Sequence, residues 1–476
     1  MAKTFKTPQD YLDSIRDGRV VYADGEKISD VTSHSITKKG ALAYAREYER
    51  FHDPELKKIF TAKDPETGEL TDLFLIPPRS ADDLLRRAKA LEVGRELRYG
   101  SALALSDAIL SLYMVGPELE KANPRYRRNV DTMYRRFREE DLIMAIAMSD
   151  TKGDRSLHPG QQHDPDLYVR KVEERDDGIV IRGMKAHISG AAYMHELVVM
   201  PTKRMKPDES DYSVTCIVSP GTPGVKLIMR PRRMTGSQFE YPISHDQVGH
   251  ECFVWFDDVF VPWERVIQNG EDWLSAPIAR GLGLLLRYSA LCTQKHYAEL
   301  MAGAGYLLAK YNGVEKAPHI QSHLFEMAML ASTMDAFVTA AALSCEMKDD
   351  MAIPNGVITN VGKYMFTDKL SEMYKYLIDI GGAIVTTQPW ESDYNNPELH
   401  EAFKKYLSGG DKATAEQRLR LYNFVRDLTA DEYAGHFLVT ELHGAGSPQA
   451  QKMMTLHGYD FEKAAEKVRR LAAIEE

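Results

Sequence analysis

The feature that most constrains the fold is a change in hydrophobic pattern near residue 142 and a second change near residue 276. Between them, short runs of β-branched or alternating apolar residues, such as LVVMPT, SVTCIVS and VKLIMR, are separated by Gly, Pro and Asp. Runs of this length with turn signals between them are typical of strands in a barrel or a sandwich. On either side, apolar residues recur at steps of three and four, which is the period of a helix. The pattern predicts an α+β fold in the order helical, β, helical.

Helix starts support this order. Thr7-Pro8 and Ser80-Ala81 each place a capping residue directly before a helical pattern. After residue 276 we expect long helical segments at 276–311, 318–348, 355–380, 413–443 and 460–474. A chain of 476 residues exceeds one compact core. We therefore expect a helical domain at 1–140, a β domain at 141–275 and a helical bundle at 276–476.

Composition and charge exclude several classes of function. The formal net charge of −10 argues against a nucleic-acid binder, because such proteins usually show a basic footprint. The four cysteines are far apart and form no CxxC, so we expect no disulfide framework and a reducing compartment. We find no apolar run that approaches the roughly 18–20 residues of a membrane span, and no signal-peptide core near the N-terminus. We expect a cytoplasmic protein that acts on a small molecule, with neither a nucleic-acid nor a membrane partner.

The stretch from Ser149 to Gly190 combines a polar loop with a predicted hairpin. The loop begins SDTKGDRS and is dense in Asp, Lys, Gly, Arg and Ser. Two β-type runs follow, at 167–175 and 179–185, with a turn at Asp176–Gly178 between them. Such a rim offers backbone N–H groups, hydroxyls and a guanidinium to an anionic or heteroaromatic ligand. From these residues alone, an ordinary charged surface loop is the favoured interpretation.

A second string, from Glu251 to Glu264, reads ECFVWFDDVFVPWE. The alternation from Phe253 to Val261 predicts a strand, and Asp257-Asp258 interrupts it as a bulge or turn does. Pro262 is expected to end the pairing. Most of this string is therefore core strand, and Glu251 at its start is a carboxylate that can be either solvated or functional.

A third string, TELHGAGSPQAQ at 440–451, follows a predicted helix. A helix end at His443-Gly444 would place a Gly and a basic side chain where a helix C-terminus favours them. This capping role explains the residue types in the string, with the exception of Glu441.

The loop and hairpin, the FDDVFVPWE strand and the HGAGSPQAQ string together resemble the 4-hydroxyphenylacetate 3-hydroxylase and 4-hydroxybutyryl-CoA dehydratase flavoprotein superfamily. The resemblance implies an acyl-CoA dehydrogenase-like fold with a middle β-barrel domain, and it implies FAD as the cofactor. It places flavin contacts at Ser149, Lys152, Arg155, Gln161, Ile188, Ser189 and, in a Gly-rich turn that reaches a neighbouring subunit's flavin, Gly381 and Gly382. In the dehydratase branch, the counterparts of Glu251 and Glu441 are active-site glutamates.

The departures from the superfamily pattern restrict the chemistry. The dehydratases hold a [4Fe–4S] cluster through three Cys and one His, and two of these Cys align near Leu97 and Ser101. Cys292 aligns with the third, but the His position is Leu285. Because thiolates hold such clusters, we predict no Fe–S cluster.

The substrate residues of the hydroxylases are also missing, since their Arg, Tyr and His positions align near Ala102, Ser106 and Ala145. We take Tyr99 and His296 as candidate donors to a bound phenolate instead.

Three functions remain open. Loss of the cluster ligands favours a two-component monooxygenase that uses FADH2 from a separate flavin reductase and O2 to hydroxylate a phenolic or other aromatic molecule. The HGAGSPQAQ string favours a cluster-free acyl-CoA dehydratase or isomerase with Glu251 and Glu441 as acid and base. The third is a non-catalytic homologue, which the intact flavin loop argues against. The superfamily precedent also implies a homotetramer.

Overall fold

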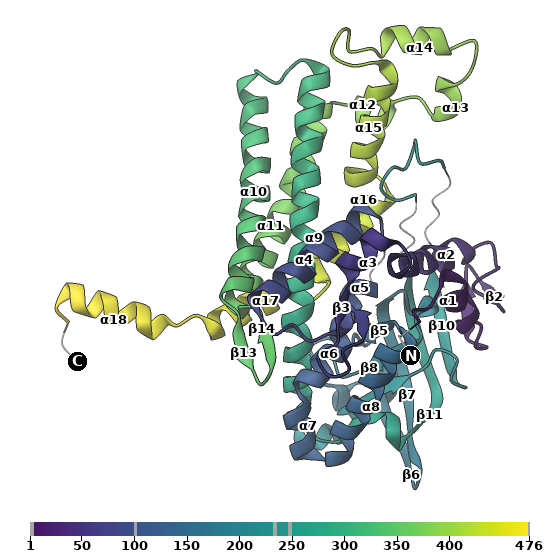
Figure 1. Ribbon diagram of the computed structural model, residues 1–476, viewed down its shortest axis with the longest axis vertical. Helices are drawn as coiled ribbons and strands as arrows, with labels where there is room; N and C mark the ends of the chain where they lie inside the picture. The colour runs from purple at the N-terminus through teal and green to yellow at the C-terminus, as the bar shows by residue number, and fades with distance from the viewer. Residues whose placement is uncertain (1–3, 100–101, 232–235, 246–249, 475–476) are drawn as a thin grey trace.

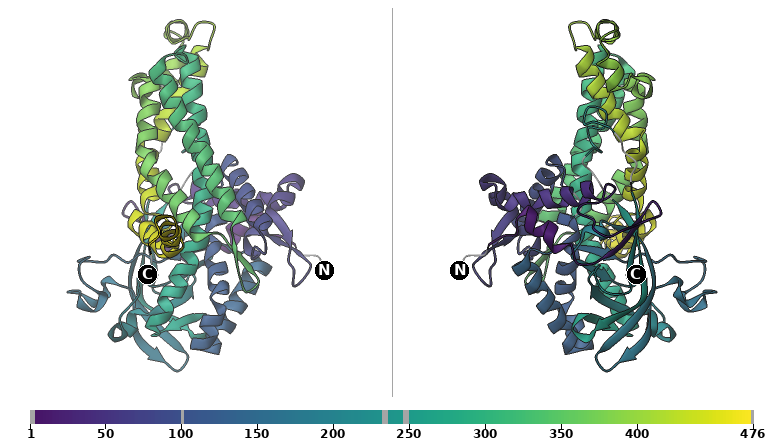
Figure 2. Two further views of the ribbon diagram at one scale, coloured as in Figure 1. Left: turned by 90° about the vertical axis from the view of Figure 1, so that its left-hand side faces the viewer. Right: turned by 90° about the vertical axis from the view of Figure 1, so that its right-hand side faces the viewer.

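The structure, a computed structural model, describes residues 4–99, 102–231, 236–245 and 250–474. It is a mixed fold of helices and strands, with the sheets in the lower body and an elongated helical bundle rising from it (Figure 1). The views from the two sides show the same bundle standing on the sheet-containing body (Figure 2).

Two open sheets form the β part. The larger sheet has the order β2-β1-β10-β11-β7-β6, and its strands are β1 (Val20–Ala23), β2 (Glu26–Ile28), β6 (Arg170–Arg175), β7 (Gly178–Ser189), β10 (Val225–Arg230) and β11 (Glu251–Pro262). The smaller sheet has the order β12-β9-β8-β5, with β5 (Met144–Ala147), β8 (Glu196–Val199), β9 (Val214–Val218) and β12 (Val266–Asn269). Neither sheet closes on itself in the described residues, so the expected barrel is not confirmed.

The central hairpin agrees with its sequence pattern. Strands β6 and β7 pair antiparallel across the predicted turn, with Arg175 opposite Gly178. Strand β11 alternates buried and exposed residues up to Phe256, and the register shifts between Phe256 and Val259. Asp258 has a φ of 53°, as a bulge residue that re-aims a strand can have. The predicted strand, its interruption at Asp257-Asp258 and its end at Pro262 are confirmed.

The N-terminal segment is mostly helical, as expected, but it also contributes strands. Its helices are α1 (Pro8–Ser14), α2 (Lys38–Arg46), α3 (Pro54–Phe60), α4 (Ala81–Glu96), α5 (Ala102–Leu105), α6 (Asp107–Met114), α7 (Gly116–Ala122) and α8 (Pro124–Glu140). A small hairpin joins β3 (Thr61–Lys63) and β4 (Leu70–Asp72). Thr7 and Ser80 accept hydrogen bonds at the starts of α1 and α4, which confirms both predicted caps. The sequence pattern missed β1, which pairs in parallel with β10.

The C-terminal half is a bundle of long helices. These are α9 (Ser275–Asn312), α10 (Pro318–Leu343), α11 (Gly356–Gly381), α15 (Ala415–Thr429), α16 (Glu432–His443), α17 (Pro448–Gly458) and α18 (Phe461–Ala472). Shorter elements are α12 (Ile384–Thr387), α13 (Glu391–Tyr394), α14 (His400–Tyr406) and the hairpin of β13 (Glu346–Lys348) with β14 (Met351–Ile353). Helix α18 projects away from the bundle (Figure 1).

Buried apolar residues form two main cores. One surrounds the sheets and includes residues of α1, α2, α6, α8 and the start of α9. The other lies inside the bundle and also takes in residues of α3 and α4. Residues 1–140 therefore contribute to both cores, and the three domain ranges stay a prediction.

Segment 236–245, between β10 and β11, docks on the bundle. Asp427 on α15 is fully buried, and its Oδ2 accepts hydrogen bonds from the backbone N–H groups of Ile243 and Ser244 at 2.8 and 2.7 Å. Arg426 donates to the carbonyl oxygen of Glu240 at 2.6 Å. These contacts join the connection between β10 and β11 to helix α15 of the bundle.

Helix α10 is long and apolar enough to cross a membrane by length and composition, and a bent pair at 102–114 and 116–122 also meets that test. The sequence analysis, which looked for an uninterrupted apolar run, missed both. The finding is weak evidence for a span because core helices of soluble proteins pass the same test. Here α10 packs along α9 and α11.

Candidate functional site

A buried ion pair anchors the start of the polar loop. Lys185 Nζ lies 2.7 Å from Asp150 Oδ1, and both side chains are 2% exposed. The same ammonium donates to the carbonyl oxygens of Met148 and Met200 at 2.9 and 2.8 Å, and Val169 N donates to Asp150 Oδ1 at 3.0 Å. A buried pair with these extra hydrogen bonds can hold a unique geometry. The loop is therefore fixed to strand β7 at its base.

The first predicted flavin contacts lie beside the end of β7. The carbonyl oxygen of Ser149 accepts a hydrogen bond from Ala186 N at 2.7 Å. Lys152 has a left-handed backbone, with a φ of 75°. Burial lowers the pKa of the His187 imidazole, and the positive charges of Lys152 and His443 lower it further. These three basic residues, called the basic corner below, belong to the polar loop, the end of β7 and the end of α16, and they influence one another electrostatically.

Two other predicted contacts lie on the outer part of the loop. Arg155 and Gln161 are exposed. Gln161 Oε1 accepts a hydrogen bond from His158 N at 3.1 Å and so helps to shape a local turn. No described contact joins either residue to Ile188 or Ser189.

Ser189 and Glu251 form a cross-strand pair. Ser189 Oγ lies 2.9 Å from both carboxylate oxygens of Glu251 and donates to them, and the neighbouring pair is Ile188 opposite Cys252. The Ile188 side chain is buried in the core, so only its backbone faces a ligand. His436 Nε2 on α16 lies 3.9 Å from Glu251 Oε1. The structure thus brings two predicted site residues into contact at the junction of β7, β11 and α16.

Glu441 lies on a different side of α16, facing the bundle. Gln294 Nε2 donates to Glu441 Oε2 at 2.6 Å, and Lys363 Nζ donates to the Glu441 carbonyl oxygen at 3.0 Å. Burial raises the pKa of Glu441, while the charge of Lys363 and the hydrogen bond from Gln294 oppose the shift. Burial lowers the pKa of Lys363 to about 8. A carboxyl and an ammonium whose pKa values both move toward neutrality are suited to proton transfer near pH 7.

Sequence reasoning missed four residues of this region. His187 directly precedes the predicted contacts Ile188 and Ser189, so its position in the sequence could have predicted that it belongs to the site. Its φ of 63° marks it as an unusual strand residue, but only the structure shows this. His436, Gln294 and Lys363 carried no local signal, because helices distant in sequence bring them to Glu251 and Glu441.

Tyr99 and His296 lie inside packed surroundings. Tyr99 is 3% exposed and packs against Phe60 at a ring distance of 5.9 Å, and burial raises its pKa to about 12. His296 is 9% exposed and meets Tyr297 edge-on at 5.8 Å. No described contact joins either side chain to Glu251 or Glu441, so their roles as phenolate donors stay a prediction.

Gly381 and Gly382 lie at the end of α11, next to α12 at the top of the bundle, whereas β7 lies in the lower body (Figure 1). Gly382 has a φ of 74°, a conformation that favours glycine. Within one chain these glycines therefore do not meet Ser189.

In the described part of the chain, no group of three or more His, Cys, Asp or Glu side chains could hold a metal ion. Of the positions aligned with cluster cysteines, Leu97 is an exposed residue just after α4, and Ser101 lies outside the described residues. Burial raises the pKa of the Cys292 thiol to about 12, which disfavours the thiolate that metal binding needs.

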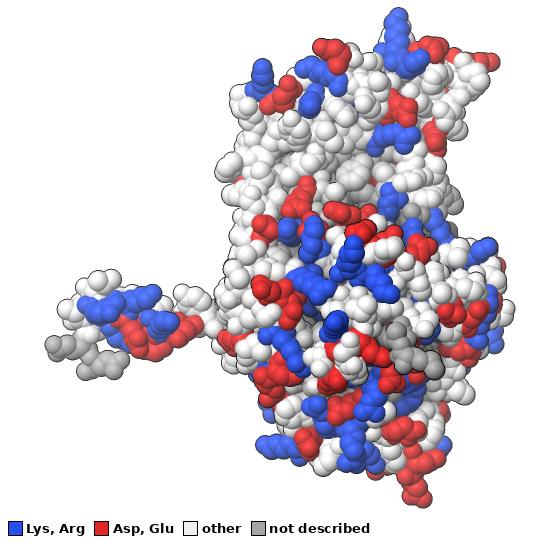
Figure 3. Space-filling view, viewed as in Figure 1, with Lys and Arg blue, Asp and Glu red and all other residues white. Residues whose placement is uncertain are grey.

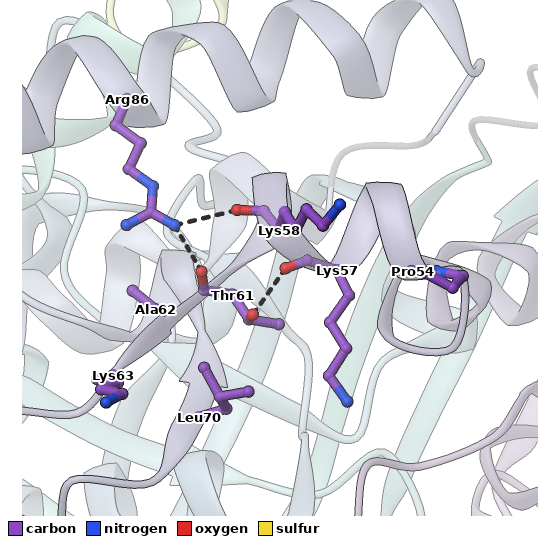
Figure 4. Close-up of a pocket in the computed structure, with 8 residues that line it drawn as sticks. All are labelled: Pro54, Lys57, Lys58, Thr61, Ala62, Lys63, Leu70 and Arg86. Atoms are coloured by element: carbon purple, nitrogen blue, oxygen red, sulfur yellow. Dashed lines mark hydrogen bonds between the residues drawn. The ribbon is translucent and has the colours of Figure 1, made fainter.

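A separate hollow of about 580 Å³ lies on α3 and the β3–β4 hairpin (Figure 4). It is lined by Pro54, Lys57, Lys58, Thr61, Ala62, Lys63, Leu70 and Arg86. Arg86 Nη2 already donates to the carbonyl oxygens of Lys58 and Thr61. None of the predicted site residues lines this hollow.

Comparisons with known proteins show which family the chain belongs to. The family model described as the 4-hydroxyphenylacetate 3-hydroxylase N-terminal region matches residues 7–268, and the C-terminal model matches residues 279–473. The chain is 28% identical to the 4-hydroxybutyryl-CoA dehydratase/vinylacetyl-CoA-Δ-isomerase of Clostridium aminobutyricum, over 98% of this chain and 99% of the relative. It is 27% identical to the FADH2-dependent monooxygenase TftD of Burkholderia cepacia, over 92% and 86%.

Among solved structures, the oxygenase component of 4-hydroxyphenylacetate 3-monooxygenase complexed with FAD has a TM-score of 0.90 at 23% identity, with 98% of each chain covered. That likeness shows the fold. The two family models together span almost the whole chain, from the polar loop and hairpin to the HGAGSPQAQ string. The chain belongs to the 4-hydroxyphenylacetate 3-hydroxylase family.

Proposed function

We propose that the protein is the oxygenase of a two-component FADH2-dependent monooxygenase that hydroxylates an aromatic small molecule with O2. Reduced FAD, supplied by a separate flavin reductase, provides two electrons to O2, so that one oxygen atom enters the ring and the other leaves as water. The names of the Burkholderia relative and of the solved oxygenase component support FAD and the two-component system. The acyl-CoA dehydrogenase-like arrangement and a cytoplasmic location are part of the same proposal.

The observation that carries the proposal is the basic corner of Lys152, His187 and His443. It lies near the end of β7 and the C-terminal end of α16, where the positive charge of Lys152 suits an anionic cofactor. The Ser189 hydroxyl donates its hydrogen bond to Glu251, so its oxygen lone pairs can accept one from a flavin N–H. On this proposal these residues bind and orient the flavin, and the bundle excludes water from it.

Glu441 would handle the substrate proton. A phenol reacts more readily as the phenolate, and a carboxylate with a raised pKa can accept its proton near neutral pH. The Lys363 ammonium beside Glu441 would then stabilise the negative charge that develops.

The proposal is tested by binding and turnover. Lys152→Ala combined with Ser189→Ala should weaken FADH2 binding at least 10-fold, whereas Lys171→Ala on neighbouring β6 should leave it unchanged. With an added reductase, NADH and O2, wild type should convert one of a panel of phenols to a product heavier by one oxygen atom. Tight FADH2 binding by the double variant would contradict the site, and absence of oxygenated product across the panel would contradict the reaction.

A second function has specific support. Glu251 and Glu441 sit in different surroundings, with Ser189 and with Lys363 and Gln294, and carboxylates in unlike settings can serve as acid and base. The Clostridium relative is a dehydratase and isomerase. Anaerobic conversion of vinylacetyl-CoA, abolished by Glu441→Gln, would select this cluster-free lyase or isomerase over the monooxygenase.

We also propose self-assembly into a homotetramer. Phe325 and Leu343 on α10 are each 63% exposed, and Val468 and Leu471 on projecting α18 are 60% and 86% exposed. In the view of Figure 3, much of the bundle flank carries no charged residue, while charges of both signs cover the lower body. Large exposed apolar surfaces of this kind mark protein–protein contacts. Light scattering that gives a monomer mass at micromolar concentration would contradict the proposal.

A further inference from the structure

Arg287, in the first third of α9, is a nearly buried cation in a narrow slot. It is 9% exposed, and its Nε donates to the carbonyl oxygen of Ala445 at 2.8 Å. A β-carbon on Gly446 would come within 2.9 Å of Nη2, and one on Gly283 would come within 3.3 Å of the guanidinium. The two glycines therefore leave open the space that the planar group occupies.

This guanidinium has no acidic partner in the described part of the chain. It forms no salt bridge there, and burial lowers its pKa without any opposing carboxylate. Glu441, the half-buried carboxyl of this region, is instead influenced by Lys363 and Arg95. Because an uncompensated buried charge is costly, proteins normally pair such a group.

The hydrogen bond to Ala445 does not explain a charged residue at this place. A neutral donor could serve that single carbonyl, and only Nε is used for it. The two Nη groups make no hydrogen bond that the described residues reveal. Nη1 and Nη2 form a planar fork, whose geometry matches the two oxygens of a carboxylate.

The position of Arg287 connects it to the candidate site. Ala445 and Gly446 belong to the turn that follows α16, and the last turn of α16 carries Glu441, which accepts a hydrogen bond from Gln294, and His443. Arg287 also lowers the pKa of Lys363, so the two cations lie near each other. A ligand held at Arg287 would thus lie on the Lys363 side of the proton-transfer pair.

An unpartnered phenol adds a further donor. Tyr374, on the same helix as Lys363, is 7% exposed, and its hydroxyl has no hydrogen-bond partner in the described structure. The charge of Glu441 contributes to raising its pKa, so the two side chains lie near each other. Arg287, near Lys363, and Tyr374, near Glu441, therefore each have an unused donor.

We propose that Arg287 binds the carboxylate of an aromatic acid substrate through Nη1 and Nη2. The proposal rests on the proposed function, because it uses the same site, and it specifies the substrate as one with a free carboxylate. It makes Arg287 a binding residue that selects the acid over its amide or thioester.

The test measures binding without flavin or turnover. Benzoate, benzamide and inorganic phosphate are titrated calorimetrically into wild type, Arg287→Gln, Arg287→Lys and Arg280→Gln. Arg280 is an exposed arginine on the same helix, so Arg280→Gln makes the same change of charge away from the slot. We expect wild type and Arg280→Gln to bind benzoate about 10- to 100-fold more tightly than benzamide, the range of a charge-assisted pair.

Arg287→Gln should bind both compounds equally. Arg287→Lys should keep only part of the preference for benzoate, because it retains the positive charge but loses the planar pair of Nη donors. If circular dichroism shows that Arg287→Gln is unfolded, Arg287→Lys is the variant that tests the carboxylate assignment. The assignment is wrong if wild type does not prefer benzoate or if Arg287→Gln keeps the preference. Phosphate binding as tight as that of benzoate would show a general anion site and overturn the carboxylate assignment. Because this test measures no turnover, a failure to hydroxylate would contradict the proposed function and leave the binding result unaffected. A failure to bind benzoate would contradict the role of Arg287 and leave the proposed function standing.

Discussion

Replacing Lys185 by Met tests whether the buried ion pair holds the polar loop in place. The substitution keeps an unbranched side chain but leaves Asp150 without its cation and the carbonyl oxygens of Met148 and Met200 without a donor. Breaking a buried pair by removing one partner costs about 3–5 kcal/mol. We therefore expect the free energy of unfolding, extrapolated from urea denaturation, to fall by about 4 kcal/mol.

A matched control lies on the neighbouring strand. Lys171 pairs with Glu174 at 2.7 Å, but the two side chains are 17% and 51% exposed. Because solvent screens such a pair, Lys171→Met should cost less than about 1 kcal/mol. The double variant Asp150→Asn, Lys185→Met should recover part of the stability lost in Lys185→Met, since no charge is then left unpaired. The reasoning is refuted if Lys185→Met costs no more than the control.

Three further changes follow from the same contacts. Lys363→Met should stabilise the protein at neutral pH. The folded-state pKa of Lys363 is about 8 rather than its usual 10.5, so the unfolded chain binds more protons between these values and wild-type stability rises with pH there. The advantage of the variant, on the order of 3 kcal/mol, should therefore shrink from pH 8 upward, and a constant difference in Tm would argue against it. Asp427→Ala should speed hydrogen exchange in segment 236–245, because two backbone donors lose their acceptor; unchanged exchange would contradict that docking. Gly446→Ala, at a φ of 105°, should abolish benzoate binding by crowding Arg287, and unaltered affinity would rule out the slot.

The parts of the fold with local signals could be predicted from the sequence. The caps at Thr7 and Ser80, the β6–β7 turn and the interruption at Asp257-Asp258 each depend on residues within one turn or one hairpin. Such signals do not need the rest of the chain. Strand β1 was missed because its pairing partner β10 lies about 200 residues later.

The residues of the candidate site could be predicted from the sequence only in part. Glu251 and Glu441 were found through a family resemblance, and the structure gives each a defined partner. The buried cation Lys363 was not found, because charged residues are normally exposed and only tertiary contacts show this one as buried. Tyr99 was chosen as a candidate donor because it lies near the positions aligned with the substrate residues of the hydroxylases, while the structure surrounds it with core residues.

The location of the flavin is the claim on which the proposed function depends most. The direct measurement is a crystal structure of the protein grown with FAD. We predict density for the isoalloxazine ring and the pyrophosphate of FAD between the end of β7 and the end of α16. This density should contact Lys152, His187 or Ser189. Density at the hollow on α3, or a fully occupied flavin that touches none of these residues, would contradict the account.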